Sequence, residues 1–599
     1  MQRTEIRRGA YYDSVILMHL QRALLALPGI DDSAVMMGTE ANKEMLQQSD
    51  LLTTEATGAG ADDLIIVVSS AGEADAESAI AQVDDLINLR RATNLGSGAD
   101  GDQLGEQLSD YRPKSLQSAV QSTPAAQWVL ISVPGRYATE VAKEALRLEK
   151  NVFLYSDNVS IEDELALKQV ASEKGLLVMG PDCGTAVING VGLGFANQVR
   201  RGKIGVIGAS GTGLQHVTAR IHQLGGGITH ALGTGGRDLS EPVHAVTTRQ
   251  ALDLLNRDLA TSVIVLVSKP PAEPVAEQLI HTAALSNKPV IINFIGYNPK
   301  TSGLAGHQPE QTGNLYFCQT LDATARLAIQ LAGQQSADQS STSVDTPPNL
   351  DLSHQPTQLS NGPYYLRGLY SGGTLAYEAQ LLLQEYIPAV YANAPLNKRF
   401  GLERITESIE HTILDLGEDD FTVGRLHPMM DNEVRIKRLQ QEAEDPSVAL
   451  ILLDMVLGHG AHPDPASELA PAIAQAIDTA QQMGRTLQIV TVVVGTNEDP
   501  QNMAQQIQQL QDAGAKVELD HEEAIRSIGR QLQAQGRLTT LPPVDLAVLN
   551  EPVIALNVGL ESFTESLVVQ QTQVTHVDWR PSAGGNARLA GILSRMKSQ

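Results

Sequence analysis

The chain has 599 residues, of which 42% are hydrophobic and only 4% aromatic, and its net charge at pH 7 is −26. This length allows about three to five domains, and the composition favours aliphatic cores, which suit parallel sheets covered on both faces. The acidic balance excludes nucleic acid as a partner, because binding to a phosphate backbone requires a basic surface.

The first 199 residues are predicted to contain two α/β regions. Residues 1–92 form an N-terminal α/β region, in which "VILMHLQRALLAL" and "EADAESAIAQVDDLINL" have helical periodicity and "DDLIIVVSSA" is a buried strand. Residues 93–124 are rich in Gly, Ser, Asp and Gln and are predicted to be a flexible connection. Residues 125–199 alternate strands such as "WVLISV" and "NVFLYS" with amphipathic helices, which indicates a parallel sheet.

Two further modules and a short segment follow. Residues 200–332 run from "KIGVIG" to "PVIINFIG" and the helix after it, and residues 333–362 are a polar linker. Residues 363–540 begin with "YYLRGLYSGGTLAYEA", and residues 541–599 form a C-terminal α/β segment. The repeated alternation predicts an α/β protein made of several doubly wound parallel-sheet domains.

Two stretches repeat one local pattern, a strand, a turn of small residues and a helix. They are "GVIGASGTGLQHVTARI" and "GLYSGGTLAYEAQLL". Each turn follows the first strand of its module, at the sheet edge where open α/β sheets bind ligands. The free N–H groups of a helix N-terminus bind anions, so the turns are predicted phosphate-binding sites; the alternative is that they only cap helices. Their residues are Ser210, Gly211, Thr212 and Gly213, and Ser371, Gly372, Gly373 and Thr374.

These turns resemble the phosphate-cradling turn of the succinyl-CoA synthetase α subunit. "LISVPGRYATEVAKEALRLEKNVFLYS" with "GLLVMGPDCG" is similar to half of that family's CoA-binding domain, and "DPSVALILLDMVLGHGA" to the carboxyl domain of its β subunit. The resemblance implies tandem modules: a CoA-binding-like Rossmann half at 125–199, and CoA-ligase-like domains of flavodoxin type at 200–332 and 363–540.

A longer series of motifs resembles the FdrA family. It includes "DSVILMHLQRAL", "VMMGTEANKEML", "GLLVMGPDCGTAVI", "GITHALGTGGRDLS", "FTVGRLHPMMD" and "WRPSAGGN". The resemblance implies a subunit of the oxamate carbamoyltransferase of anaerobic allantoin degradation, a part of purine catabolism. That complex converts oxalurate and phosphate into oxamate and carbamoyl phosphate, so the expected partners are its other subunits and these small anions, with no cofactor.

Two alternatives remain open: an acyl-CoA synthetase that binds CoA, and a non-catalytic scaffold that binds an anion. The synthetase is disfavoured by three features. The N-terminal region lacks a GxxGxxG loop, the flanks of His307 differ from the family's phosphohistidine motif, and no nucleotide-binding ATP-grasp domain is legible. The scaffold and the carbamoyltransferase are hard to separate from the sequence.

For carbamoyl transfer we predict Lys269, Arg425 and His427 as catalytic groups, because Arg and Lys bind anions and His can move a proton. Candidate substrate-binding residues come from "GPDCGTA", "GTGGRD" and "WRPSAGGN", and are Asp182, Cys183, Gly235, Gly236, Arg237, Arg580 and Asn586. Arg237 could instead pair with Asp238, and His427 could be an ordinary loop residue. No base is evident beside Cys183 for a nucleophilic role.

The remaining features predict the cellular compartment of the protein and whether it binds a metal or a membrane. Its two cysteines, Cys183 and Cys318, provide neither a metal-ligand spacing nor a disulfide framework. The N-terminus has no signal-peptide apolar stretch, and no run approaches the roughly 18–20 apolar residues of a membrane helix. We therefore expect a cytoplasmic protein without a metal site or a membrane association.

Overall fold

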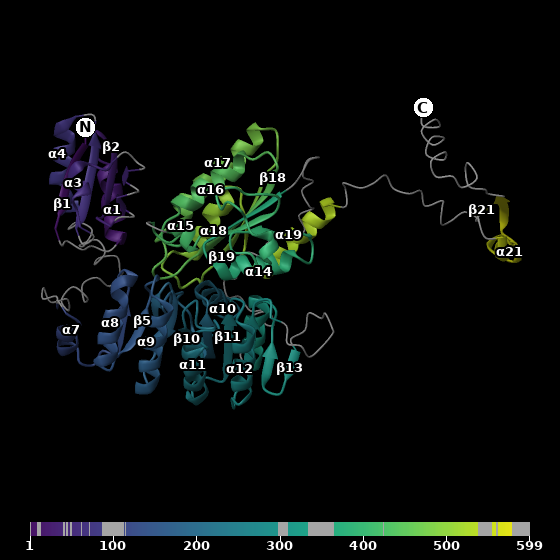
Figure 1. Cartoon of the computed structure of the whole chain (residues 1–599), viewed down its shortest axis with the longest axis horizontal. Helices are drawn as coiled ribbons and strands as arrows, with labels where there is room; N and C mark the ends of the chain where they lie inside the picture. The colour runs from purple at the N-terminus through teal and green to yellow at the C-terminus, as the bar shows by residue number, and fades with distance from the viewer. Residues whose placement is uncertain are drawn as a thin grey trace, which may run out of the picture. The chain divides into compact units, whose positions relative to one another are not determined.

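The computed structural model describes residues 2–8, 14–39, 42–43, 46–47, 51–60, 63–70, 72–86, 113, 115–297, 310–333, 365–422, 425–536, 554–558 and 561–577 (Figure 1). Residues Met1–Leu532 form one unit and Gln533–Gln599 a second. The predicted linker at 333–362 lies outside the described residues after position 333, as does most of the predicted connection at 93–124. No helix in the described ranges is long and apolar enough to span a membrane.

The sheet of the N-terminal region is wholly antiparallel, whereas the sheets that follow are built mainly of parallel strands. Its strand order is β1-β3-β2, and β1 and β2 both run antiparallel to β3. Helices α1 and α4 pack on one face and α3 on the other, so β3 is buried on both sides. The elements are β1 (Gln2–Arg7), α1 (Ser14–Leu25), β2 (Ile30–Met37), α3 (Thr54–Thr57), β3 (Leu64–Ser70) and α4 (Glu73–Ala81).

A small parallel sheet, β4-β5-β6, follows. Its elements are α7 (Leu116–Ser122), β4 (Trp128–Ile131), α8 (Gly135–Arg147), β5 (Asn151–Leu154), α9 (Ile161–Lys174) and β6 (Val178–Met179). The next two strands, β7 (Thr185–Ile188) and β8 (Val191–Gly194), pair with the following sheet instead, because Val187 of β7 pairs with Ala231 there. The sheet boundary therefore lies before β7 rather than at position 199.

The first large module has an eight-stranded sheet in the order β13-β14-β12-β11-β9-β10-β7-β8. Its parallel strands are arranged as β10-β9-β11-β12-β14, which is the 2-1-3-4-5 order of flavodoxin-like folds. The elements are β9 (Arg201–Ala209), α10 (Gly211–Gln223), β10 (Ile228–Gly233), α11 (Val246–Arg257), β11 (Val263–Ser268), α12 (Glu273–Ala284), β12 (Val290–Phe294), β13 (Glu310–Thr312), β14 (Leu315–Phe317) and α13 (Leu321–Leu331).

The second large module repeats this order with an extra edge strand, β16-β17-β15-β18-β19-β20, and all its strands are parallel. The strands are β15 (Tyr365–Tyr370), β16 (Tyr391–Ala392), β17 (Thr412–Asp415), β18 (Val448–Val456), β19 (Gln488–Val494) and β20 (Lys516–Glu518). The helices are α14 (Gly373–Leu383), the 3-10 helix η2 (Lys398–Phe400), α15 (Asp419–Thr422), α16 (Glu433–Glu444), α17 (Pro465–Gln482), α18 (Met503–Asp512) and α19 (His521–Gly536).

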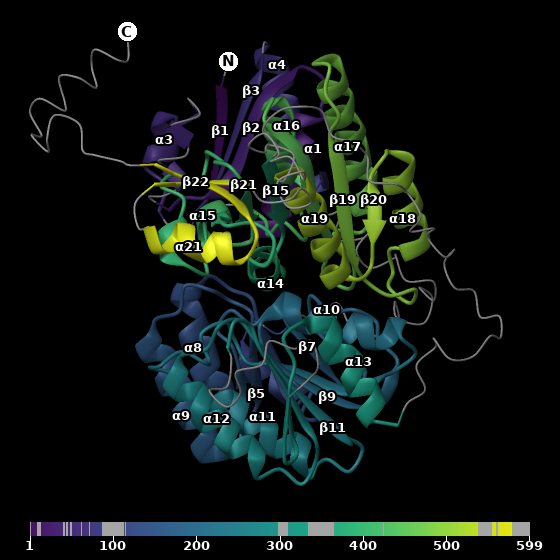
Figure 2. The ribbon, with the colours of Figure 1, turned by 90° about the vertical axis from the view of Figure 1, so that its right-hand side faces the viewer.

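Both large modules have helices on both faces of the sheet, which confirms the predicted doubly wound α/β class. In the first, α11 and α12 cover one face and α10 and α13 the other. In the second, α16, α17 and α18 cover one face and α14 and α19 the other. The modules meet where α10 and α13 pack against α14 and α19 in one shared apolar core, and α10, α13 and α14 are labelled there in Figure 2.

The C-terminal unit is a small β-α-β element. Beyond the end of α19, its described residues form β21 (Ile554–Val558), α21 (Glu561–Val569) and β22 (Gln573–Val577), with the two strands parallel. The predicted candidates Arg580 and Asn586 lie outside the described residues.

Candidate functional site

The two predicted turns meet at one place. Ser210 caps α10, and its Oγ accepts a hydrogen bond from the N–H of Gly213 at 3.1 Å. The same hydroxyl contacts the hydroxyl of Thr374, which lies in the first turn of α14. Both turns follow the first strand of a flavodoxin-like module, which is where that topology places its ligands. The carboxyl edges of the two sheets therefore share a single site.

Side chains crowd both glycines of the second turn: Thr212 of the first turn lies beside Gly372, and Asp415 and Lys269 lie beside Gly373. A Cβ at Gly372 would lie 2.2 Å from Cγ2 of Thr212, and a Cβ at Gly373 would lie 2.5 Å from Oδ2 of Asp415 and 2.7 Å from Nζ of Lys269. The φ of Gly372 is −164°, an extended value open to any residue, so the requirement for glycine at this position is steric.

The first turn is the better candidate for an anion site. Gly211 and Thr212 are the first residues of a helix of 13 residues, and the opening N–H groups of a helix have no partner within it. The hydroxyl of Thr185 is buried, has no hydrogen-bond partner among the described residues, and lies 3.6 Å from the position of a Cβ at Gly211. A small anion at this turn would meet backbone donors and a nearby hydroxyl.

Ser371 in the second turn is already occupied by a carboxylate of the protein, which differs from the prediction for this turn. Its N–H donates to Oδ1 of Asp454 at 2.8 Å, and its hydroxyl donates to Oδ2 at 2.7 Å. Asp454 is a buried residue of β18 and pairs with Nη2 of Arg435 at 3.0 Å. Ser371 thus holds the turn in place, because both of its donors are satisfied internally.

Lys269 supplies positive charge to the site, as predicted from its place directly after β11. About a third of its side chain (34%) is exposed, and Nζ lies 3.4 Å from Oε1 of Glu418. Burial acts to lower the pKa of Lys269, but the nearby Asp415, Glu418, Tyr377 and Asp182 outweigh it and raise the pKa above the ordinary value. The ammonium group is therefore charged at neutral pH.

Asp415 is the acid–base group that sequence reasoning missed. It ends β17, is 2% exposed, and accepts a hydrogen bond from the N–H of Gly417 at 3.0 Å. Burial raises its pKa to about 7, Glu418 adds to the rise, and Lys269 opposes it. Asp415 can therefore give or take a proton near neutral pH. Its position at the carboxyl end of the strand beside β15 is the signal that could have identified it.

His427 lies at the same sheet edge but is neutral. Its Nδ1 accepts a hydrogen bond from the N–H of Met429 at 3.2 Å, which leaves the ring proton on Nε2. Burial, helped by Arg435, lowers the pKa of His427 to about 4. Nε2 lies 3.0 Å from the position of a Cβ at Gly417, so the ring can serve as a neutral donor. Arg425 is exposed two residues before it.

Three other candidates are brought together beside Lys269. Asp182 follows a cis Gly180–Pro181 bond, and a Cβ at Gly236 would lie 2.7 Å from its Oδ2. Gly235 has a φ of +93° and packs against the carbonyl of Pro181. Asp182 is an exposed residue, but the protein around its carboxyl partly desolvates it and raises its pKa to about 6, while Lys269 acts to lower the pKa and Asp157 to raise it.

The structure corrects two predicted ligand contacts. Cys183 is 2% exposed, and burial raises the pKa of its thiol to about 12, so it cannot reach a substrate or act as a nucleophile. Arg237 pairs with the buried Glu164, with Nη2 3.0 Å from Oε2, and donates to the carbonyl of Val159 at 2.7 Å. This ion pair links the segment after β10 to α9 of the small parallel sheet. Arg237 does not pair with Asp238.

The residues that the structure describes contain no cluster of three or more His, Cys, Asp or Glu side chains able to hold a metal ion.

Comparisons with known families agree with this architecture. A family described as CoA-ligase matches residues 369–530, and a family described as CoA binding domain matches residues 199–296. The second match covers β9 to β12 and leaves out the small parallel sheet before them, which the sequence resemblance had assigned to CoA-binding. These matches define the class: an α/β protein with succinyl-CoA-ligase-like modules in tandem.

A third family, described as AllF, heavy metal-associated domain, matches residues 1–103. These residues contain no cysteine and a single histidine, His19, so they do not fit a heavy-metal site of the usual thiolate kind. The match therefore concerns the fold of the N-terminal region.

Comparison with individual proteins identifies the family of the chain. YahF of Escherichia coli (strain K12) is 41% identical over 509 residues, which cover 85% of this chain and 94% of YahF. The α subunit of the succinate–CoA ligase of Aquifex aeolicus (strain VF5) is 26% identical over 199 residues, which cover 32% of this chain and 64% of that subunit. The apo acetyl-coenzyme A synthetase 1 of Ca. Korarchaeum cryptofilum covers 69% of this chain and 84% of its own, with 15% identity and a TM-score of 0.28. The chain belongs to the FdrA family, together with YahF.

Proposed function

We propose that this chain is a subunit of a carbamoyltransferase that converts oxalurate and phosphate into oxamate and carbamoyl phosphate during allantoin degradation. Membership of the FdrA family and the match of residues 1–103 to an AllF domain support the pathway. The observation that carries the proposal is the meeting of two helix N-termini beside one lysine and one carboxyl group of raised pKa.

Phosphate binds at the first turn of α10. The N–H groups of Gly211 and Thr212 and the positive end of the helix dipole attract it, and Thr185 can donate a further hydrogen bond. Lys269 neutralises part of its charge. The turn of α14 is the weaker anion site, since Asp454 already occupies the donors of Ser371.

The reaction needs one bond to form and one to break. A phosphate oxygen attacks the ureido carbonyl carbon of oxalurate, and the C–N bond to the oxamate nitrogen then breaks. The phosphate proton must reach that nitrogen, which leaves as the amide of oxamate. Protonated Asp415 can give its proton to that nitrogen and then take up the phosphate proton, because its pKa of about 7 lets it donate and accept at neutral pH. The Nε2–H of His427 can stabilise the developing oxyanion as a neutral donor.

The chemistry requires neither a nucleotide nor a cofactor. The proposed partners are the other subunits of the oxamate carbamoyltransferase complex, and the proposed ligands are phosphate, carbamoyl phosphate, oxalurate and oxamate. We place this complex in the cytoplasm, where carbamoyl phosphate can be used.

Acyl-CoA synthesis is the second candidate function. It is favoured by the matches of residues 199–296 to CoA binding domains and of residues 369–530 to CoA-ligases. It is disfavoured because the sequence has no legible ATP-grasp domain and no family-type phosphohistidine motif.

The proposal is tested by steady-state kinetics on the assembled complex with oxalurate and phosphate, with carbamoyl phosphate measured by phosphorus NMR. Lys269→Met should raise the KM for phosphate and lower kcat/KM by about 100-fold, as expected for loss of a charge-assisted contact of about 3 kcal/mol. Lys143→Met, at an exposed lysine on α8, is the matched control. Thioester formation from an acid, CoA and ATP without carbamoyl phosphate would instead establish the synthetase.

A further inference from the structure

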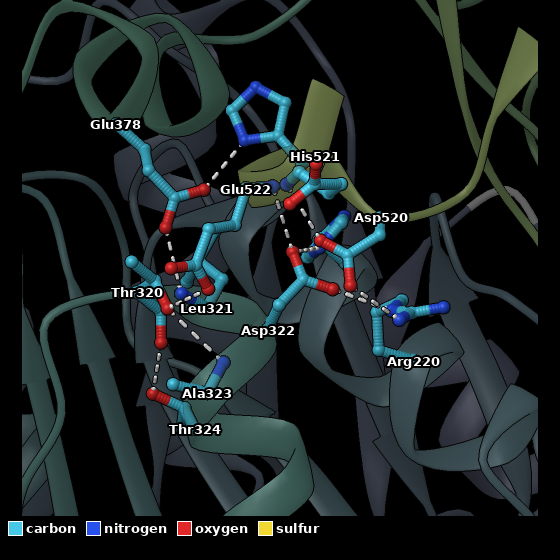
Figure 3. Close-up of polar contacts among 12 residues, drawn as sticks. Arg220, Thr320, Leu321, Asp322, Ala323, Thr324, Glu378, Asp520, His521 and Glu522 are labelled. Carbon is cyan, nitrogen blue, oxygen red and sulfur yellow. Dashed lines mark hydrogen bonds and ion pairs between the residues drawn. The ribbon is translucent and has the colours of Figure 1, made fainter. Parts of the chain in front are cut away.

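A buried network of charged residues lies behind the two turns, where α10, α13, α14 and α19 meet (Figure 3). We call it the helix-junction network. Figure 3 shows Glu378 pointing toward His521, and Asp322 between Arg220 and the start of α19. The network consists of His216, Arg220, Asp322, Glu378, Asp520, His521 and Glu522.

Each module contributes one buried histidine–carboxylate pair on equivalent helices. In the first module, Nε2 of His216 on α10 lies 3.1 Å from Oδ2 of Asp322 on α13. In the second, Nδ1 of His521 on α19 lies 2.6 Å from Oε2 of Glu378 on α14. The order of the two residues is reversed between the modules. The histidine lies on the first helix, α10, in the first module and on the last helix, α19, in the second. The two rings stand 6.0 Å apart across the junction.

Hydrogen bonds across the junction tie the two pairs together. The N–H of Leu321 donates to Oε1 of Glu378 at 2.7 Å, and the N–H of Glu522 donates to Oδ2 of Asp322 at 3.3 Å. Nη2 of Arg220 donates to Oδ2 of Asp520 at 3.0 Å. Each buried carboxylate is therefore held by both modules at once.

Asp322 remains ionised at neutral pH although it is fully buried. Burial acts to raise the pKa of Asp322, but His216, Arg220 and His521 outweigh it and hold the pKa well below its usual range. A buried ion pair adds little net stability over an apolar replacement, but it tolerates only one geometry, because breaking it leaves an uncompensated charge. Such a network is suited to fixing the relative position of the helices that carry it.

The network lies at the same distance along α10 and along α14 from the first residue of each helix. His216 is five residues after Gly211, where α10 begins, and Glu378 is five residues after Gly373, where α14 begins. Five residues of helix span about 7.5 Å. A slide or rotation of one helix would therefore separate Ser210 from Thr374 in the site and break the network at the same time.

We propose that Asp322, Glu378 and His521 are positioning residues, which hold α10 and α14 in register so that their two turns form one anion site. The kinetic part of the test rests on the proposed function. The structural part is independent of it, because it concerns only the order of the two helix N-termini.

The test uses the full chain in its complex, with the variants Glu378→Gln and His521→Gln. His281→Gln, at an exposed histidine on α12, is the matched control. Hydrogen exchange should become faster in the first turns of α10 and α14 but not in α17, while unfolding stays cooperative. The kcat/KM for phosphorolysis should fall by about 100-fold, the loss expected for a misplacement of about 1 Å. The double variant should lose no more than the more damaging single variant.

Unchanged exchange and kinetics in folded His521→Gln would overturn the inference. A rise in exchange spread evenly over both modules would also overturn it, because that result indicates general destabilisation. If either variant fails to fold, Tyr370→Phe removes only the hydroxyl that lies 2.9 Å from Nε2 of His521 and gives a milder version of the same test. If the wild-type complex makes no carbamoyl phosphate, the proposed function fails, and the exchange experiment still decides the inference.

Discussion

Gly372→Ala tests directly whether the two turns touch. The added Cβ would lie 2.2 Å from Cγ2 of Thr212, whereas carbon atoms in contact are about 3.5 Å apart. The turns would therefore have to separate by about 1.3 Å. Overpacking of this kind costs about 1–3 kcal/mol, and a misplacement of about 1 Å in a site costs about 100-fold in rate. We expect Gly372→Ala to slow carbamoyl phosphate formation by about 100-fold. We also expect this variant to unfold at a lower urea concentration than the wild type.

The matched variant is Thr212→Ala, which removes Cγ2 and Oγ1 and leaves the Cβ of residue 212 at 3.1 Å from the new methyl group. Gly372→Ala should therefore cost less in the Thr212→Ala background than in the wild type, and a double-mutant cycle measures the difference. Carbamoyl phosphate formation reports the site, and urea unfolding reports the packing without relying on activity. Wild-type behaviour of Gly372→Ala, or an equal cost in both backgrounds, would refute the contact between the turns.

Three further predictions follow from the buried groups. Activity that depends on protonated Asp415 should fall as the pH rises through about 7, and Asp415→Asn should abolish that limb of the pH–rate profile; an unchanged profile would assign the proton to another group. Asp322→Asn should lower the free energy of unfolding by about 3–5 kcal/mol at neutral pH. Because the folded pKa of Asp322 is depressed, this difference should shrink as the pH falls below about 4, and a difference that is constant with pH would contradict the account. Cys183 should resist alkylation at pH 8 until urea unfolds the chain, since its pKa is about 12, and mass spectrometry of native and unfolded samples checks this.

Most of the architecture could be predicted because central strands of both large modules, such as β11, β12 and β18, are mostly apolar. The run at Val448–Val456 is buried over its whole length, and such runs indicate parallel strands covered on both faces. The antiparallel sheet of the N-terminal region could not be predicted in this way. Pairing direction depends on which strands become neighbours, and the local pattern of Leu64–Ser70 resembles that of a parallel strand.

The sequence predicted those site residues whose position depends only on the end of a nearby strand. Ser210 and Lys269 follow strands directly, and Thr374 lies in the turn and helix start that follow β15, so their place at the sheet edge was legible. The contact between Ser210 and Thr374 was not legible, because it depends on how the two modules pack. Asp415 was missed although it ends a strand, because its raised pKa comes from burial and from neighbours that only the folded structure brings together.

Arg237 and Cys183 were misassigned because the folded structure, and not the local sequence, decides what their side chains contact. Arg237 was expected to bind substrate or to pair with its neighbour Asp238, but Glu164, which is 73 positions away in the chain, takes its guanidinium. Cys183 was expected to contact substrate, but its side chain is buried and its thiol contacts the carbonyl of Thr185. A long-range ion pair decided the role of Arg237, and burial of the side chain decided that of Cys183.

The measurement that tests the central claim most directly is nucleotide-free phosphorolysis. The complex of this chain with its partner subunits is incubated with oxalurate and phosphate, without ATP or CoA, and phosphorus NMR follows the products. The account predicts carbamoyl phosphate and oxamate in equal amounts, and loss of both with Gly372→Ala. Oxalurate that stays intact in the wild-type complex, with thioester formed once an acid, CoA and ATP are added, would contradict it.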